Sequence, residues 1–403
     1  MRIAWRNIIR NRKRSLITIS AIGFGLGAII FIWSFVEGAH EAMIKNYTAL
    51  TTSQIEISQK GFHDNPKIEN YLTDSDKIIS TIHSYDATID AAKRVRAAGL
   101  ISSTESSYGV MIFGIDPDNE QKISHLHKHI KEGEFLTKGD KKSILLGKGL
   151  AKNLNIGLDE KVVIMSQAID GSIAAGAYYV NGLINSGVDE VDKSLAVIDL
   201  EAAQELFVLE GVTDIGLRVN NISAAEKTAE ELINVLPDPD LEILPWSSIS
   251  PSLKQWIEFD NAFVFVILII VMIVVAIGIL NTVLMGVLER IREFGILLAV
   301  GTRPSQIIQM IGWESFLLGL LGCLFGLTLG YTTSIYFGEV GVDLSAFTSA
   351  LTSFYMDAVV KPKFHLGFTL ISAGATLIIS CLVSIYPAWY ASNLKPVEAI
   401  RTL

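Results

Sequence analysis

Two short stretches of the sequence carry polar residues whose types and spacing could support chemistry. The first is HLHKH, which has histidines at alternate positions, His125, His127 and His129. Alternate residues of a β-strand face the same side, so three imidazoles there could ligate one zinc or nickel ion. The alternative is a solvated histidine-rich helix or loop between Lys122 and Lys131. The motif contains no carboxylate or cysteine to complete a site, and we expect this chain to bind no metal.

The second stretch, LERIREFGILLAVGTRPSQI (Leu288–Ile307), is charged at one end and apolar at the other. As a helix, it would place Glu289 and Glu293 one turn apart near its start, where the helix dipole favours acids. Arg290 and Arg292 would offer guanidinium groups, which bind carboxylates with two parallel hydrogen bonds. This half of the stretch therefore suits recognition of a charged partner.

The apolar half of this stretch would continue the same helix. Phe294, Leu297 and Leu298 would rest against the membrane face or a partner's apolar groove, and Gly301 would end the helix. The alternative is an interfacial loop whose charges only orient the chain in a membrane. The residues by themselves leave both interpretations open.

Signatures of catalysis are absent from the sequence. There is no G-x-x-x-x-G-K-[ST] phosphate loop, because GKGLAK lacks the earlier glycine and the hydroxyl residue. The motifs G-x-S-x-G and H-E-x-x-H and paired-cysteine sites are also missing. We therefore expect no enzymatic activity, no nucleotide site and no bound cofactor in this chain.

The rest of the chain positions these two stretches, and it contains long apolar runs. Half of the residues are hydrophobic and the mean hydropathy is +0.41, which indicates membrane segments combined with a soluble part. About 20 apolar residues cross the hydrocarbon core of a bilayer. A buried core helix is the alternative for any one run, and a cleaved signal peptide is the alternative for the first. We predict four spans from the uncharged runs Ser15–Val36, Asn261–Leu288, Ser315–Gly338 and Leu366–Asn393.

Basic residues orient these spans, because Lys and Arg in short loops stay in the cytoplasm. The run before the first span contains no acid and the basic residues Arg2, Arg6, Arg10, Arg12, Lys13 and Arg14. Both termini are then cytoplasmic, in agreement with Lys395 and Arg401. The predicted order is a cytoplasmic amphipathic helix 1–14, span 15–38, outer domain 39–258, span 259–288, cytoplasmic helix 289–304, span 305–338, short outer loop 339–365, span 366–392 and cytoplasmic tail 393–403.

Glycines recur at helical spacing in the third run, at Gly319, Gly322, Gly326 and Gly330. Small residues at this spacing let two helices approach closely, and contact with lipid is the alternative. The spacing predicts close helix packing.

The segment 39–258 is strongly acidic, whereas the rest of the chain carries a small positive charge. An acidic surface disfavours nucleic acid as a partner. Both cysteines, Cys323 and Cys381, fall in predicted spans, so this domain has no disulfide. Strands are predicted at 54–59, 108–116, 143–147, 161–166, 178–184 and 194–200, and helices at 74–85, 147–154, 200–209 and 224–236, the last capped by Ser223. The predicted fold class is an α+β membrane protein, with this large mixed α/β domain inserted between the first two of four transmembrane helices.

Several motifs together resemble one known family, the MacB/FtsX-type permeases of type VII ABC transporters. The stretch LERIREFGILLAVG is similar to the family's E-R-x-R-E-x-G-x-L-x-A-x-G, and YPAWYASNLKPVEAIR is similar to its P-A-x-x-A-x-x-x-P-x-E-A-L-R ending. AWRNIIRNRKRSLITISAIGFG resembles the first span with its basic preface. GIDPDN, EGEFL, SILLGKGLAKNLNIGLDEKVVI and VIDLEAAQELF resemble the periplasmic domain of MacB and of the lipoprotein-releasing permeases LolC and LolE.

The resemblance implies a multi-pass permease of the bacterial inner membrane that works with a separate ABC ATPase dimer, which binds ATP and Mg. Closure of the ATPases would move the spans and the MacB-like periplasmic domain, a process called mechanotransmission. Two copies, or this chain and a paralogue, would form the working unit, and a periplasmic chaperone or adaptor protein is a further candidate partner. The cytoplasmic stretch would be a coupling helix that docks on the ATPase through Glu289, Arg290, Arg292, Glu293, Phe294, Gly295, Leu297 and Gly301.

Extraction of lipoproteins from the membrane is the first interpretation of the substrate. The periplasmic domain is too large for the cell-division FtsX type, and the MacB type usually carries its ATPase in the same chain. Acyl chains would then enter between the first two spans, lined by Phe24, Phe31, Phe35, Phe263 and Phe265, for which lipid contact is the alternative role. MacB-like efflux of peptides or amphiphiles and a membrane sensor or scaffold without transport are the alternative functions.

Overall fold

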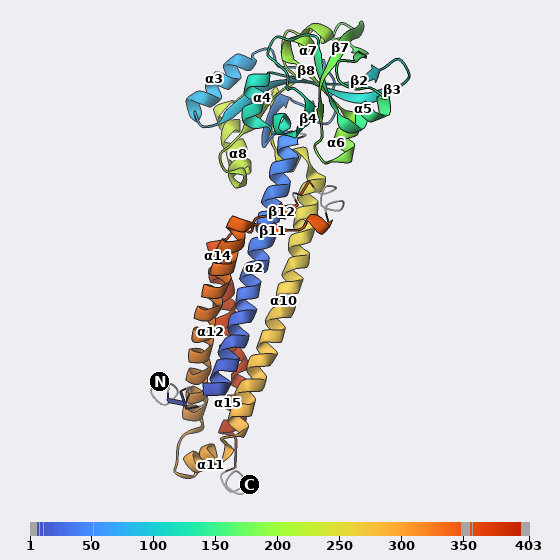
Figure 1. Ribbon diagram of the computed structural model, residues 1–403. Coiled ribbons are helices and arrows are strands. Elements are labelled where there is room, and N and C mark those ends of the chain that lie inside the picture. Colours follow the sequence, from blue (N-terminus) through green and yellow to red (C-terminus); the bar gives the residue numbers. More distant parts are fainter. Residues whose placement is uncertain are drawn as a thin grey trace. The chain divides into compact units, whose positions relative to one another are not determined.

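The computed structural model describes residues 6–7, 9–10, 12–50, 52–347, 355–356 and 358–395. The chain divides into two compact units, to both of which helices α2 and α10 contribute (Figure 1). Unit 1 contains Met1–His40, Ile257–Leu344 and Val359–Leu403, and unit 2 contains Glu41–Trp256 and Ser345–Ala358. Part of the predicted helix 1–14 and most of the predicted tail 393–403, including Arg401, lie outside the described residues.

Unit 2 is built on one mixed sheet of ten strands. Their order is β10-β1-β9-β2-β3-β8-β5-β7-β4, and β6 pairs with β2 and β7. Most neighbouring strands are antiparallel, whereas β3 with β8 and β5 with β7 are parallel. The strands are β1 (Ile55–Gln59), β2 (Asp90–Ser102), β3 (Ser107–Ile115), β4 (Ile130–Gly133), β5 (Ser143–Gly147), β6 (Lys161–Gln167), β7 (Ile173–Ile184), β8 (Leu195–Asp199), β9 (Asp214–Arg218) and β10 (Leu241–Pro245).

Short helices pack on this sheet and complete its core. Aliphatic side chains from the strands, such as Ile112 and Ile164, are fully buried together with Phe207 of α7. Helix α7 begins directly after β8 because the Asp199 side chain accepts a hydrogen bond from the N–H of Glu201, which caps the helix. The helices are α3 (Ser75–Tyr85), α4 (Pro117–Ile123), α5 (Lys148–Leu154), α6 (Asp189–Ser194), α7 (Leu200–Phe207), α8 (Ala225–Val235) and α9 (Trp246–Ile249), with the 3-10 turns η1 (Leu126–His129) and η2 (Ile222–Ala224).

The predicted mixed α/β character of this domain is confirmed, and each predicted strand and helix is present, although β7 starts earlier, at Ile173. The sequence pattern does not predict β2, β4, β9 and β10. In β2, alanines and charged residues replace the β-branched residues that usually mark a strand. The prediction of Ser223 as a helix cap is wrong. The Asn221 side chain accepts a hydrogen bond from the N–H of Ser223 and starts η2, so α8 begins later, at Ala225.

Unit 1 consists mainly of long apolar helices, and four helical segments of the described chain have the length and composition to cross a membrane. They are α2 (Arg12–Leu50), α10 (Pro251–Leu288), α12 (Pro304–Val340) and the segment formed by α14 (Leu366–Val383) and α15 (Ile385–Ser392). The remaining elements are α11 (Ile291–Ala299), β11 (Val342–Asp343), η3 (Ser345–Phe347, in unit 2) and β12 (Val359–Val360).

The last apolar segment is not one uninterrupted helix, because α14 ends at Val383 and α15 starts at Ile385. Pro387 explains this break. Its ring nitrogen has no hydrogen to donate to the carbonyl of Val383, and its ring would clash with that carbonyl in a straight helix.

Glycines of α12 pack directly against α2. A Cβ atom added to Gly322, Gly326 or Gly330 would lie 2.6–2.8 Å from the Cβ atoms of Ile22, Leu26 and Ile30, respectively. Such distances are shorter than van der Waals contact, so only glycine permits this approach. Gly319 packs instead against Ser380 of α14. The predicted close packing is confirmed at all of these positions.

Candidate functional site

The charged stretch after α10 folds as a turn, a short helix and a second turn. Helix α10 ends at Leu288, and α11 starts at Ile291. At the end of α11, the N–H of Gly301 bonds to the carbonyl of Leu298 at 3.1 Å, and the N–H of Thr302 bonds to that of Leu297 at 3.0 Å. Gly301 has φ +95°, a backbone conformation that glycine adopts without strain. The prediction that Gly301 ends this helix is confirmed.

The acidic residues of the stretch make ion pairs with the N-terminal segment of the same chain. Glu289 pairs with Arg14 at 2.7 Å, and Glu293 pairs with Arg10 at 3.0 Å. The hydrogen bond from Arg290 lowers the pKa of Glu293 below its ordinary value. The expectation that both acids share the first turn of one helix is wrong, because Glu289 lies in the turn before α11.

Arg290 is turned into the protein instead of toward solvent. Its side chain is 11% exposed and contacts Glu293 at 2.8 Å and Glu314 of α12 at 3.4 Å. With its amide oxygen facing Arg290, Asn7 accepts from Nη1 and Nη2 at 3.2 and 3.1 Å. The guanidinium also lies 5.2 Å from the ring centre of Phe294. The expectation that Arg290 offers donors to a partner is therefore corrected. Only Arg292 of the predicted arginine pair is exposed and makes no ion pair with the described residues.

Phe294 anchors α11 to the long helices. Its side chain is 1% exposed and belongs to a core with Val287 of α10, Ile307 and Ile311 of α12, and Ala388 and Ala391 of α15. Its predicted contact with a membrane face or a partner's groove is wrong, because the protein's own helices enclose it. The neighbouring Gly295 is also buried.

The opposite side of α11 faces outward. Arg292, Ile296, Leu297 and Val300 are exposed, and Val300 has 82% of its surface accessible. An open groove of about 800 Å³ runs beside this face and is lined by residues that include Leu297, Gln306 and Trp313. The structure thus divides the predicted coupling residues into an inward set that holds α11 in place and an outward set available for contact.

The histidine motif does not fold as the strand that a shared face for the three imidazoles would require. Residues 126–129 fold as the turn η1 and not as a strand, so the alternate spacing does not align the three imidazoles. Among the described residues, no group of three His, Cys, Asp or Glu side chains is placed to hold a metal ion. Burial, together with the charges of Lys128, Arg218 and Lys45, lowers the pKa of His125 to about 4.

The five phenylalanines expected between the first two spans are not brought together. Phe24 and Phe31 of α2 contact Phe325 and Phe337 of α12, with ring centres 5.6 and 5.5 Å apart. Phe263 and Phe265 of α10 are exposed, and Phe35 is half-buried. The seam between α2 and α10 contains other apolar side chains, namely Ile29, Ile32, Trp33, Val36, Val264, Leu268, Val271 and Met272.

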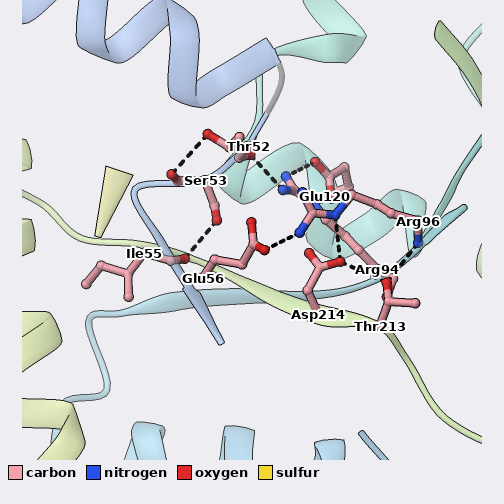
Figure 2. A network of polar contacts seen from close by, with 9 residues as sticks. All are labelled: Thr52, Ser53, Ile55, Glu56, Arg94, Arg96, Glu120, Thr213 and Asp214. Carbon is pink, nitrogen blue, oxygen red and sulfur yellow. Dashed lines mark hydrogen bonds and ion pairs between the residues drawn. The ribbon is translucent and has the colours of Figure 1, made fainter. Parts of the chain in front are cut away.

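A buried charged cluster in unit 2 was missed by sequence reasoning. Arg94 of β2 binds Glu120 of α4 through Nε at 3.0 Å and Nη2 at 2.6 Å, and its Nη1 donates to the carbonyl of Thr52 at 2.6 Å (Figure 2). The second arginine of β2, Arg96, lies between Glu56 of β1 and Asp214 of β9. Two arginines at alternate positions of an apolar stretch, RVR, are the signal that could have indicated it.

The cluster joins the chain that follows α2 to the part of the sheet formed by β1, β9 and β2. Thr52 follows the last residue of α2 closely, and β1, β9 and β2 are neighbours in the sheet. Burial and the negative charge of Asp214 raise the pKa of Glu56, although Arg96 opposes this shift, and the two carboxylates keep Arg96 charged. Because three carboxylates meet two guanidinium groups, one acid is in excess.

Comparison with known proteins identifies the family. The family model described as the MacB-like periplasmic core domain matches residues 15–235, and that of the FtsX-like permease C-terminal domain matches residues 265–396. This chain belongs to the MacB- and FtsX-type ABC transporter permeases. The FtsX-like match includes the whole of α11, and the buried Ala388 and Ala391, which contact Phe294, belong to the terminal motif that sequence analysis singled out.

Named relatives of the permease come from two branches of the family. The lipoprotein-releasing system transmembrane protein LolC of Neisseria meningitidis is 24% identical, over 99% of this chain and 98% of its own. The macrolide export ATP-binding/permease protein MacB of Acinetobacter baylyi is 23% identical, over 97% of this chain and 57% of its own. The periplasmic region of MacB from Actinobacillus actinomycetemcomitans aligns with a TM-score of 0.35 at 15% identity, over 53% of this chain and 97% of that chain.

Proposed function

We propose that this permease couples ATP hydrolysis by a separate ABC ATPase to movement of its outer domain, and that α11 is the element on which the ATPase acts. The observation that carries this proposal is the two-sided character of α11. Its inward residues fix it to the long helices, and its outward residues are free to contact another protein.

The contacts of α11 explain how a force on this helix would spread. Phe294 packs in one core with residues of α10, α12 and α15. Arg290 ties the turn before α11 to Glu314 of α12, while Glu289 and Glu293 hold the N-terminal segment. Because interlocked side chains resist deformation, a displacement of α11 would move these helices together instead of bending the connection.

Helix α10 is long enough to carry such a movement across a bilayer. Its 38 residues extend about 57 Å at 1.5 Å per residue, which exceeds the roughly 30 Å of the hydrocarbon core. In our proposal, both termini and α11 are cytoplasmic and unit 2 lies in the periplasm. The basic residues Arg10 and Arg14, which pair with Glu293 and Glu289, support this orientation.

We propose that the substrate is a lipoprotein, which the permease releases from the membrane. This assignment is supported by LolC relatives that match nearly the whole of this chain and nearly the whole of their own length. In this proposal an acyl chain would enter between α2 and α10, at the seam that buries Ile29, Val264 and Leu268 in this structure. The match to MacB supports efflux of peptides or amphiphiles as a second candidate.

Co-purification with a co-expressed ABC ATPase tests the coupling. We expect Arg292→Ala and Leu297→Asp to weaken the complex and the stimulation of ATP hydrolysis, since both side chains are exposed and, within the described part of the chain, neither belongs to an ion pair or a buried cluster. Arg12→Ala removes an exposed arginine outside α11 and should leave both unchanged. If no complex forms, or if all three variants behave alike, α11 is not the coupling element.

The substrate is tested on the same purified complex. Mass spectrometry should detect an acylated lipoprotein bound in the absence of ATP and released after ATP is added. A complex that carries no lipoprotein but exports an amphiphilic peptide from reconstituted vesicles would refute the lipoprotein assignment and favour efflux.

A further inference from the structure

A small cationic pocket in unit 2 is not used by the proposed coupling. It has a volume of about 160 Å³ and is formed where the end of α2, the start of η1 and the end of β9 meet. Its polar lining includes Lys45 of α2, His125 before η1 and Arg218 of β9, together with Glu41 and Gln54.

We propose that this pocket binds a phosphate group, either of a phospholipid headgroup or of a soluble phosphate ester. Lysine and arginine donate charge-assisted hydrogen bonds to phosphate oxygens, and here they approach one cavity from two different elements. A volume of about 160 Å³ equals the share of about five water molecules in the liquid, so a phosphate with its closest substituents fits.

Hydrogen bonds fix parts of the pocket wall, and one of them holds the guanidinium of Arg218 in place. The N–H of His125 bonds to the carbonyl of Ala49 at 3.2 Å, which holds this residue against α2. The side-chain oxygen of Gln54 accepts from the N–H of Val219 at 2.9 Å. Arg218 uses Nη1 to donate to the carbonyl of Lys122 at 3.0 Å, which leaves the other nitrogens of its guanidinium for a ligand.

The charge of the pocket is opposite to that of the domain around it. The segment 39–258 is strongly acidic overall. Lys45 is exposed and makes no ion pair with the described residues, and Glu41 is the only acid among the described residues that line the pocket. The pKa of His125 is about 4, through burial and through Lys128, Arg218, Lys45 and His127. A local positive potential in an acidic domain selects anions at this position.

Because Lys45 lies on α2 beyond the predicted span, a lipid headgroup is one of the two candidate sources of the phosphate group. In our proposed topology the span ends near Gly38, and seven further residues of a helix extend about 10 Å. The headgroup layer of a bilayer adds about 5–8 Å to each side of the hydrocarbon core. A long lysine side chain on α2 can therefore reach the headgroup layer.

The test uses the full-length permease in a neutral maltoside detergent, with the histidine ring carbons labelled for NMR. Inorganic phosphate is added against chloride of equal ionic strength, and we expect the pKa of His125 to rise because a bound anion stabilises its charged form. In a parallel arm, nanodiscs of phosphatidylglycerol are compared with nanodiscs of a phosphate-free galactolipid. If the pKa of His125 rises only in the phosphatidylglycerol nanodiscs, the ligand is a lipid headgroup. If it rises with inorganic phosphate, the ligand is a soluble phosphate ester.

Variants test whether phosphate binding at this pocket causes the change in the pKa of His125. Lys45→Gln should weaken phosphate binding about tenfold, the value of one charge-assisted hydrogen bond. Lys152→Gln removes another exposed lysine of unit 2, which lies outside the pocket, and should have no effect. Failure of both phosphate sources to raise the pKa of His125 would overturn the proposal, and so would equal losses in the two variants. Neither result would affect the assignment of α11 as the coupling element.

Discussion

The buried pair Arg94–Glu120 provides the sharpest test of what stabilises unit 2. Its nitrogen and oxygen atoms are 2.6 Å apart, and the two side chains are only 3% and 1% exposed. Glu120→Leu would leave the Arg94 guanidinium buried without the carboxylate to which it donates hydrogen bonds. Removing one partner of a buried ion pair destabilises a protein by about 3–5 kcal/mol, and we expect a loss of this size. That is a large part of the roughly 5–15 kcal/mol by which domains are stable.

A matched control lies at the adjacent position of the same strand. Lys93 pairs with Asp76 at 2.7 Å, but the side chains are 24% and 91% exposed. Water solvates both partners there, so Asp76→Ala should cost less than about 1 kcal/mol. The two pairs have nearly the same length, but the control pair is exposed and is joined by one hydrogen bond instead of two.

The double variant Arg94→Met/Glu120→Leu separates the cost of an unpaired buried charge from the cost of losing the hydrogen bonds of Arg94. It removes the unpaired charge, and apolar groups of similar volume often replace a buried ion pair without a large loss. The carbonyl of Thr52 then loses the donor Nη1, at a cost of about 1–3 kcal/mol. We therefore expect the double variant to be more stable than Glu120→Leu alone.

Hydrogen exchange measured by mass spectrometry on the full-length permease gives the free energy of opening of β2 and β9. The reasoning is refuted if Glu120→Leu costs no more than Asp76→Ala. It is also refuted if the double variant is less stable than Glu120→Leu.

Three further predictions concern the other buried contacts. Burial raises the pKa of Glu56, so this residue stabilises the fold below the ordinary glutamate pKa, and the stabilisation is lost as pH rises through the raised pKa. The Glu56→Gln variant should not show this loss, and at neutral pH its free energy of unfolding should be higher than that of the wild type. Gly326→Val should push α12 away from Leu26 and cost about 1–3 kcal/mol in thermal unfolding assays. Phe294→Ala should loosen α11 by about 3–5 kcal/mol, seen as faster hydrogen exchange in α11 and weaker ATPase stimulation.

Each of these predictions has a control in the same chain. Glu210→Gln changes an exposed carboxylate and should leave the pH profile of stability unchanged. Gly312 of α12 has open space where a Cβ would lie, so Gly312→Val should be tolerated. Ile296→Ala truncates an exposed side chain of α11 and should not accelerate exchange. A variant and its control with the same effect would contradict the corresponding prediction.

Local patterns in the sequence determined much of this protein. Uncharged apolar runs predict the long helices because crossing a bilayer requires length and hydropathy, which are properties of one segment. Gly301 predicts the end of α11 because the required positive φ belongs to a single residue. The family motifs identify the permease for the same reason, since they are read along the chain.

The roles of individual side chains were decided only by the tertiary structure. The four charges of the stretch 289–293 are similar in the sequence, yet Arg290 is buried against Glu314 and Arg292 is exposed. Glu293 finds its partner, Arg10, at the other end of the chain. The arginines of β2 likewise meet carboxylates from β1, β9 and α4. The energy of a charge depends on its burial and on its nearest partners, and these are set by segments that are far apart in the sequence.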